Sequence, residues 1–230
     1  MIGNALFWAD YISRVILPQV DALQAAVGER LLPAFEGVTD EAEEVQRQRW
    51  EELMARAHPE TDPGDLAEAA LEAGIDHYTM LGELKQGLLN MLAVAAFHLL
   101  EQHIFGIYGR EVLERADQRN VGLYTLPLVV KRFRAQGVDL VSFESWPRVQ
   151  ELRLVANTVK HGEGRSADDL RAARPELFVN PILRDQEWAT RGLGQAERPL
   201  FGYGLYVTVE ELHAYMADVR AFWSELRSGQ

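Results

Sequence analysis

A long stretch of regularly spaced apolar residues constrains the fold of this chain most strongly. It lies between Ile75 and Ile107, and its clearest helical stripe consists of Leu81, Leu84, Leu88, Leu92, Ala95 and Leu99. Recurrence at three- and four-residue intervals is typical of one face of a helix. Further apolar residues occupy the other faces, and a helix that is apolar nearly all round is buried. The stretch therefore predicts the central helix of a bundle.

Amphipathic segments before this stretch predict further helices. Residues 5–31 follow a helical pattern, which Pro18 is expected to kink or split because proline lacks a backbone donor and crowds the preceding turn. A second helix is expected from about Asp40, where Asp40 and Glu43 have the spacing of a capping box, to about Ala57. After a linker at 58–64, a short helix at 65–73 is expected to end at Gly74.

The sequence of the second half predicts three clear helices: Leu126–Gln136, Trp146–His161, and a last helix that begins after Thr208. Thr208 and Glu211 have the spacing of a capping box, and the residues that follow are apolar on one face up to Leu226. The region 175–207 has little periodicity and is broken by proline and glycine, so we expect an irregular excursion there. A short strand is expected at Leu205–Val207, and the aromatic residues Phe201, Tyr203 and Tyr206 are expected to pack. The sequence thus predicts an all-α helical bundle in a single domain, residues 1–230.

Composition excludes several classes of function. The chain has no cysteine, so disulfides and thiolate metal sites are excluded, and a reducing, cytoplasmic location is expected. The net charge of −12 argues against a general DNA-coating protein. Residues 110–174 are the exception, with 12 basic and 9 acidic residues, and there a local phosphate site is compatible with the charge. The most apolar run, Leu88–Leu100, is too short to span a bilayer, so no membrane association is expected.

One polar stretch interrupts the helical pattern in this basic third. Arg153, Asn157 and His161 are spaced four residues apart, which places all three on one face of the helix over Trp146–His161. Gly162 follows at the position where a helix commonly ends. These three are the candidate catalytic residues, and Lys160, Arg165, Lys131 and Arg132 are the candidate phosphate-binding residues. The alternative interpretation is a solvated stripe, or a C-terminal cap of the helix made by His161.

The Asn157–Gly162 stretch, Asn-Thr-Val-Lys-His-Gly, resembles the signature region of the HEPN superfamily. Its members are all-α domains, many of them RNA-cleaving toxins, phage-defence effectors or RNA-processing factors. Asn157 matches the polar position of the family motif and His161 matches its histidine. The position before the asparagine, where the family has arginine, is Ala156, and the nearest arginine is Arg153, one turn earlier.

The resemblance implies an RNA- or nucleotide-directed effector, with two alternatives left open. In the first, the protein is a metal-independent endoribonuclease of a toxin or phage-defence type, acting as a homodimer without a cofactor. In the second, it is a catalytically inactive helical module that binds a nucleotide, an antitoxin or another partner protein, as the alanine at position 156 favours. A metal pair at His98 and Glu101 is a weaker hypothesis, because no third ligand is evident and no metal is expected.

Overall fold

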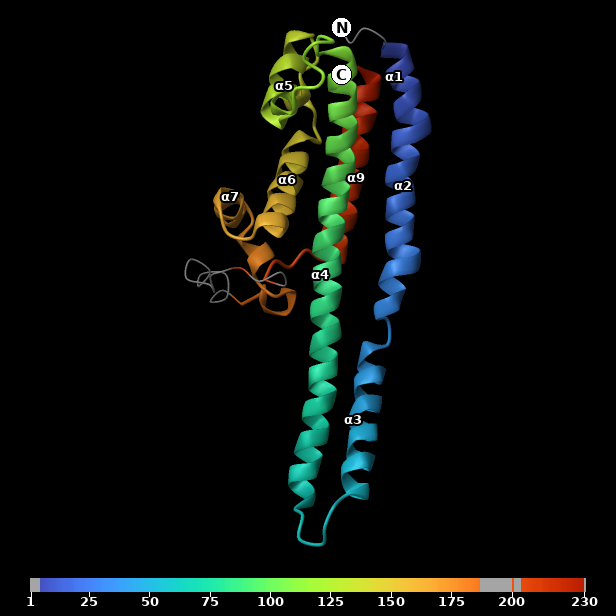
Figure 1. Cartoon of the computed structure of the whole chain (residues 1–230), viewed down its shortest axis with the longest axis vertical. Coiled ribbons are helices and arrows are strands. Elements are labelled where there is room, and N and C mark those ends of the chain that lie inside the picture. Colours follow the sequence, from blue (N-terminus) through green and yellow to red (C-terminus); the bar gives the residue numbers. More distant parts are fainter. Residues whose placement is uncertain (1–4, 187–199, 201–203, 230) are drawn as a thin grey trace. The chain divides into compact units, whose positions relative to one another are not determined.

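The computed structural model describes residues 5–186, 200 and 204–229, and the regular secondary structure among these residues is entirely helical, with no strand. Figure 1 shows the arrangement of the elements. The α-helices are α1 (Ala5–Tyr11), α2 (Leu17–Ala26), α3 (Val38–Ala55), α4 (Pro63–Glu111), α5 (Leu126–Ala135), α6 (Trp146–His161), α7 (Arg165–Ala173) and α9 (Val209–Ser228). The prediction of an all-α fold with a long central helix is confirmed.

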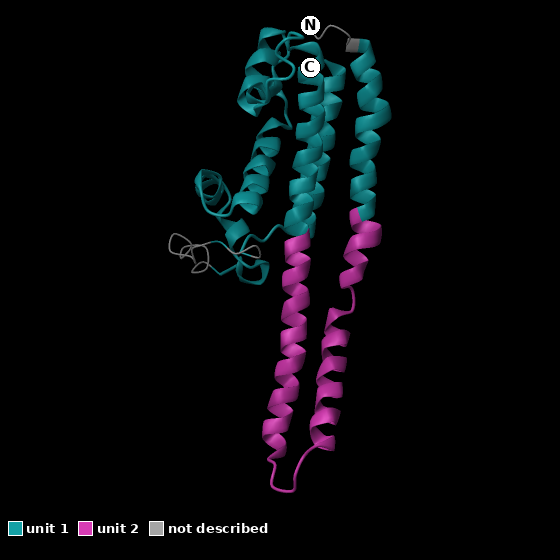
Figure 2. Cartoon of the chain, viewed as in Figure 1, with its two compact units in different colours: residues 1–26, 89–230 teal, residues 27–88 magenta. Residues whose placement is uncertain are grey.

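The chain forms two compact units, which Figure 2 distinguishes by colour. The first unit consists of residues 1–26 and 89–230, and the second of residues 27–88. The helix α4 contributes its first half to the second unit and its second half to the first. The sequence indicated no such division, because the apolar pattern of α4 continues through it.

The second half of α4 forms the centre of the first unit. Its apolar side chains from Leu89 to Tyr108 are largely buried. The ring of His103 lies edge-on to Trp223 of α9, with 6.1 Å between the ring centroids. Tyr108 stacks on Phe133 of α5 at 6.4 Å. The core of this unit is therefore built from α4 together with helices that lie far from it in the sequence.

The helix α4 is 49 residues long and continues through Gly74, so the prediction of a short helix ending there is wrong. A Cβ atom at Gly74 would lie 2.9 Å from the carbonyl oxygen of Ala42 on α3. Glycine is present because α3 passes close to it, and the interior of a helix tolerates it at a cost of about 1 kcal/mol. By length and composition α4 is also long and apolar enough to cross a membrane, a property that the core helices of soluble proteins share.

Other local predictions were partly right. Helical structure continues past Pro18, and the chain accommodates the proline with a π-helical turn over Ile12–Ile16. The helix α3 begins at Val38 after Gly37, whose φ of 78° lies in the left-handed region, so the capping box expected at Asp40 is absent. The capping box of Thr208 and Glu211 at the start of α9 is confirmed.

The region between α7 and α9 contains two short 3-10 helices, Pro175–Phe178 and Pro181–Leu183. The strand expected at Leu205–Val207 is not formed. A backbone hydrogen bond of 2.7 Å, from the amide of Tyr206 to the carbonyl oxygen of Leu177, joins this segment to the first 3-10 helix. The packing expected of Phe201 and Tyr203 concerns residues outside those that the structure describes.

Candidate functional site

The helix α6 has the bounds predicted for it, Trp146–His161. Pro147 lies in its first turn, where a missing backbone donor is tolerated. Most of its apolar face is buried, at Val149, Leu152, Val155 and Ala156, and the helix ends at Gly162, whose amide donates a 2.8 Å hydrogen bond to the carbonyl oxygen of Thr158. With φ at 65°, Gly162 adopts a backbone conformation that favours glycine. The predicted site residues therefore lie on one regular helix.

The three candidate catalytic residues share a face of α6, and no hydrogen bond joins any two of them in the described chain. His161 is exposed, and Asn157 and Arg153 are half-buried. The Nε of Arg153 donates a 3.1 Å hydrogen bond to Oε1 of Gln150, one turn nearer the start of the helix. At a rise of 1.5 Å per residue, Arg153 and His161 are about 12 Å apart along the axis. The guanidinium group thus leans away from His161.

The position at which the HEPN motif has arginine is part of the core in this protein. Ala156 is completely buried, whereas Arg153 and Asn157 reach the surface. An arginine at position 156 would bring a charge into an apolar interface without a partner, which is strongly unfavourable. On the surface of α6, Arg153 is the arginine that shares a face with His161.

The candidate phosphate-binding residues lie in two places. Lys160 and Arg165 are exposed and flank the turn that connects α6 to α7, next to His161. Lys131 and Arg132 belong to α5, which lies at the opposite end of α6 in Figure 1. The structure therefore brings Lys160 and Arg165 towards His161 and does not bring α5 there. Within the described chain, no carboxylate pairs with any of these four cations.

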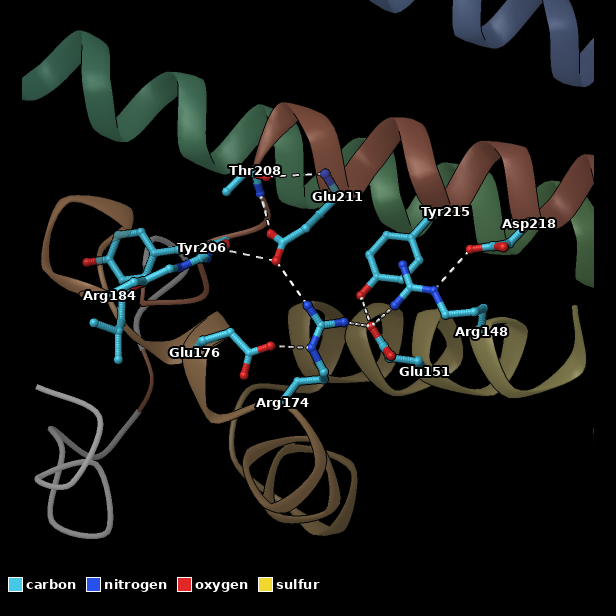
Figure 3. Close-up of polar contacts among 11 residues, drawn as sticks. Arg148, Glu151, Arg174, Glu176, Arg184, Tyr206, Thr208, Glu211, Tyr215 and Asp218 are labelled. Carbon is cyan, nitrogen blue, oxygen red and sulfur yellow. Dashed lines mark hydrogen bonds and ion pairs between the residues drawn. The ribbon is translucent and has the colours of Figure 1, made fainter. Parts of the chain in front are cut away.

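A network of charged residues that the sequence did not predict lies between α6, α9 and the segment after α7. Its centre is Glu151, whose Oε1 accepts hydrogen bonds from Arg148 at 2.6 Å, from the Tyr215 hydroxyl at 2.6 Å, and from Arg174. Arg148 also binds Asp218 of α9 at 3.1 Å, and its guanidinium lies 4.7 Å from the centre of the Tyr215 ring. Figure 3 shows Arg148, Tyr215 and Arg174 pointing towards Glu151, and Asp218 pointing towards Arg148.

The network continues to the start of α9. Arg174 pairs with Glu176 and donates to Glu211 at 3.1 Å. Arg184 donates to the same Glu211 oxygen at 3.3 Å and to the backbone carbonyl of Tyr206 at 2.6 Å. Because Glu211 also completes the capping box of α9, one carboxylate joins the cap of that helix to two arginines (Figure 3).

Burial and charge perturb the groups of this network. Burial raises the pKa of Tyr215 well above its usual value, and the hydrogen bond to the Glu151 carboxylate raises it further. Burial disfavours the charged form of Arg174, but its bonds to Glu176 and Glu151 outweigh that effect and raise its pKa. The network therefore keeps Tyr215 neutral and Arg174 charged.

The arrangement indicates a structural role for the network. Arg148, Arg174 and Arg184 are each engaged by carboxylates, so a phosphate would have to displace an internal partner. Arg171 of α7 is engaged in the same way by Glu163, at 2.7 Å. The sequence signals were the three-residue spacing of Arg148 and Glu151 and the capping box of Glu211, because Arg174 and Tyr215 lie 23 and 64 residues from Glu151.

Two of the three histidines of α4, His98 and His103, are engaged by amide side chains. His98 lies 2.9 Å from the Gln102 amide and 3.9 Å from the Glu101 carboxylate, while His103 lies 2.7 Å from Gln19 of α2. Burial lowers the pKa of His103. Across the described part of the chain, no three histidine, aspartate or glutamate side chains gather as metal ligands would.

A separate apolar pocket of about 350 Å³ lies elsewhere in the first unit, between α1, the end of α4, the turn after α5 and the end of α9. Trp8, Ile12, Ile107, Val138 and Leu226 supply most of its apolar lining. None of the predicted site residues lines it.

Comparison with known protein families, curated proteins and solved structures finds no match to this chain.

Proposed function

We propose that this protein is a HEPN-like, RNA- or nucleotide-directed effector that binds phosphate at the surface formed by the end of α6 and the start of α7. The observation that carries the proposal is a contrast among the cations of these two helices. Arg148 and Arg171 are engaged by carboxylates, whereas Lys160 and Arg165 have no carboxylate partner in the described chain and are exposed beside His161. Unpaired cations beside a histidine suit a phosphate ligand.

In the catalytic version, the reaction is cleavage of RNA without a metal. The ribose 2′-oxygen attacks the adjacent phosphorus, its bond to phosphorus forms as the bond to the 5′-oxygen breaks, and the products are a 2′,3′-cyclic phosphate and a 5′-hydroxyl. A histidine suits the proton transfers because its ordinary titration range is near neutral pH. Asn157 would orient His161 or the phosphate, and Arg153 would neutralise charge on the phosphoryl oxygens after leaving Gln150.

The second candidate is a catalytically inactive module that binds a nucleotide, an antitoxin or another partner protein. Two specific observations favour it over the enzyme. Arg153 is hydrogen-bonded to Gln150 and leans away from His161, and the position of the family's arginine is the buried Ala156. The enzyme and a nucleotide-binding module would use the same phosphate-binding surface, so binding and cleavage are to be measured separately.

The deciding experiment measures both on the same variants. Cleavage of an end-labelled RNA is compared between the parent chain, His161→Ala, Asn157→Ala and Arg153→Ala, with His58→Ala as a control at another exposed histidine. A substrate with 2′-deoxyribose at the scissile position identifies contaminating metal-dependent nucleases, which still cut it. Cleavage lost in His161→Ala but kept in His58→Ala supports the enzyme, whereas binding without cleavage supports the inactive module.

Binding is measured by the anisotropy of a labelled RNA at several salt concentrations. We expect Lys160→Ala and Arg165→Ala to weaken binding and lower its salt dependence, because each removes one phosphate contact. Arg56→Ala, at an exposed arginine without a carboxylate partner in the described chain, is the control. Lys131→Ala and Arg132→Ala test whether the surface extends to α5. If Lys160→Ala and Arg165→Ala leave the affinity unchanged, the proposed surface is wrong.

We also expect a homodimer, because the resemblance implies two copies of the motif in one cleft. A second copy would bring a second arginine to His161, in addition to Arg153, which is hydrogen-bonded to Gln150 within the chain. Light scattering at tens of micromolar protein tests this, and a monomeric mass would contradict it. A cytoplasmic location and the absence of membrane association stay predictions.

A further inference from the structure

The second unit is a helical hairpin, residues 27–88, in which the usual distribution of apolar residues is reversed. Its buried apolar side chains are small or medium in size, at Val27, Ala42 and Ala70. Six of its large apolar side chains are exposed instead: Met54, Leu71, Ile75, Tyr78, Met80 and Leu84. A small unit that buries so little has a marginal core, and large exposed apolar patches mark interaction sites.

Three of these exposed residues form a continuous row on α4, which we call the apolar stripe. Leu71, Ile75 and Tyr78 are spaced four and three residues apart and therefore share one helix face. Their exposed fractions are 47%, 54% and 53%, so no other side chain of the chain covers them fully.

A row of carboxylates, which we call the acidic ridge, lies directly beside the apolar stripe. Glu68, Glu72 and Asp76 are four residues apart, and Glu72 and Asp76 each follow a stripe residue in the sequence. At 100° per residue, the ridge lies on the adjoining face of the same helix. All three residues are exposed, and no cation pairs with any of them within the described chain.

The charge of the hairpin identifies what kind of molecule fits this surface. Residues 27–88 contain 15 acidic and 5 basic residues, so the hairpin carries nearly all of the chain's net negative charge. Arg47 and Arg49 pair with glutamates of α3 and leave the carboxylates of α4 unneutralised. A second hairpin, RNA or an anionic membrane would be repelled by this surface, whereas a cationic polypeptide would be attracted.

The hairpin also offers a place for an anchoring side chain. A pocket of about 290 Å³ lies at the Tyr78 end of the apolar stripe, between the start of α3 and α4. Phe35, Val38 and Leu81 line it together with Tyr78. It is large enough to hold one aliphatic or aromatic side chain, which is the usual anchor of a helix that binds in a groove.

We infer that the apolar stripe and the acidic ridge form a docking surface for a cationic amphipathic helix of a partner protein. The apolar face of that helix would cover Leu71, Ile75 and Tyr78 and place one side chain in the pocket. Lysines or arginines on its adjoining face would pair with Glu68, Glu72 and Asp76. This surface would act whether or not the end of α6 binds RNA.

The test uses the full chain and a defined probe. The probe is a fluorescein-labelled 18-residue peptide of leucine and lysine, with leucine at helical i, i+3, i+4 and i+7 positions, and binding is followed by anisotropy. Two matched peptides accompany it: one with the same residues reordered so that no apolar face exists, and one with glutamate in place of lysine. The expected result is saturable binding of the first peptide, at least tenfold weaker binding of the reordered one, and none of the glutamate peptide.

Two triple variants separate the apolar and ionic contributions. Leu71→Ser/Ile75→Ser/Tyr78→Ser removes the stripe, and Glu68→Gln/Glu72→Gln/Asp76→Asn removes the charge of the ridge. Each should weaken binding at least tenfold, and the ridge variant should also lose most of the salt dependence. Val121→Ser and Glu144→Gln, at exposed positions of the other unit, are the controls and should bind normally. Circular dichroism establishes that every variant keeps its helices.

Three outcomes would overturn the inference. The first is equal binding of the ordered and reordered peptides, which would reduce the interaction to nonspecific charge attraction. The second is unchanged affinity in both triple variants while they remain folded. The third is a dimer of the chain alone that the stripe variant converts to a monomer, because a second copy would then be the molecule that covers the stripe.

Discussion

Replacement of Glu151 by alanine should destabilise the first unit by about 3 kcal/mol. The Tyr215 side chain is completely buried and loses its acceptor, and an unsatisfied buried hydroxyl costs about 1–3 kcal/mol. Arg148 keeps Asp218 and Arg174 keeps Glu176, and both side chains are partly exposed to water. Each arginine therefore loses only about 0.5–1 kcal/mol, as an exposed ion pair does.

The assay is urea unfolding at pH 7, followed by circular dichroism, with the midpoints of variants compared at a common slope. Glu151→Gln should lose only about half as much stability as Glu151→Ala, because its amide oxygen still accepts from Tyr215. Glu144→Ala is the matched control, since Glu144 is exposed and forms no hydrogen bond or ion pair in the described chain. If Glu151→Ala and Glu144→Ala unfold within about 0.5 kcal/mol of each other, which is the range of surface substitutions, the network does not stabilise the fold.

Three further predictions follow from packing and titration. Trp223→Ala should destabilise the folded protein by about 3–5 kcal/mol, because the indole is completely buried. A shift in thermal midpoint no larger than that of a surface substitution would contradict the place of Trp223 in the core. The free energy of unfolding should fall as the pH rises above about 10, where tyrosine in the unfolded chain ionises. The reason is that the raised pKa of Tyr215 keeps its hydroxyl protonated in the folded state. Tyr215→Phe should therefore flatten this alkaline slope when urea unfolding is measured as a function of pH. Gly74→Ala should destabilise the hairpin, because the new Cβ would lie 2.9 Å from a backbone oxygen of α3. Gly82 has open space around it, so Gly82→Ala should stabilise the hairpin by about 0.5–1 kcal/mol. Equal thermal midpoints for the two variants would refute the close approach at Gly74.

The sequence by itself predicted features whose interactions are local. The bounds of α6 and the cap of α9 follow from residues within four positions of each other, such as Thr208 with Glu211, and helical periodicity extends over neighbouring turns. For the same reason Arg153, Asn157 and His161 could be placed on one face before the structure was known. The all-α fold follows from these local patterns taken together.

The tertiary structure decided everything that depends on residues far apart in the chain. Gly74 had the sequence pattern of a helix end, but the passage of α3 beside it explains why the glycine lies within a 49-residue helix. Glu151 had the pattern of a surface ion pair with Arg148, but packing against α9 and the segment after α7 brings Tyr215 and Arg174 to the same oxygen atom. The packing of α6 also buries Ala156 in the core and leaves Arg153 hydrogen-bonded to Gln150. A helical pattern states which residues share a face, whereas the partners of that face depend on how distant segments pack, and no local spacing encodes that.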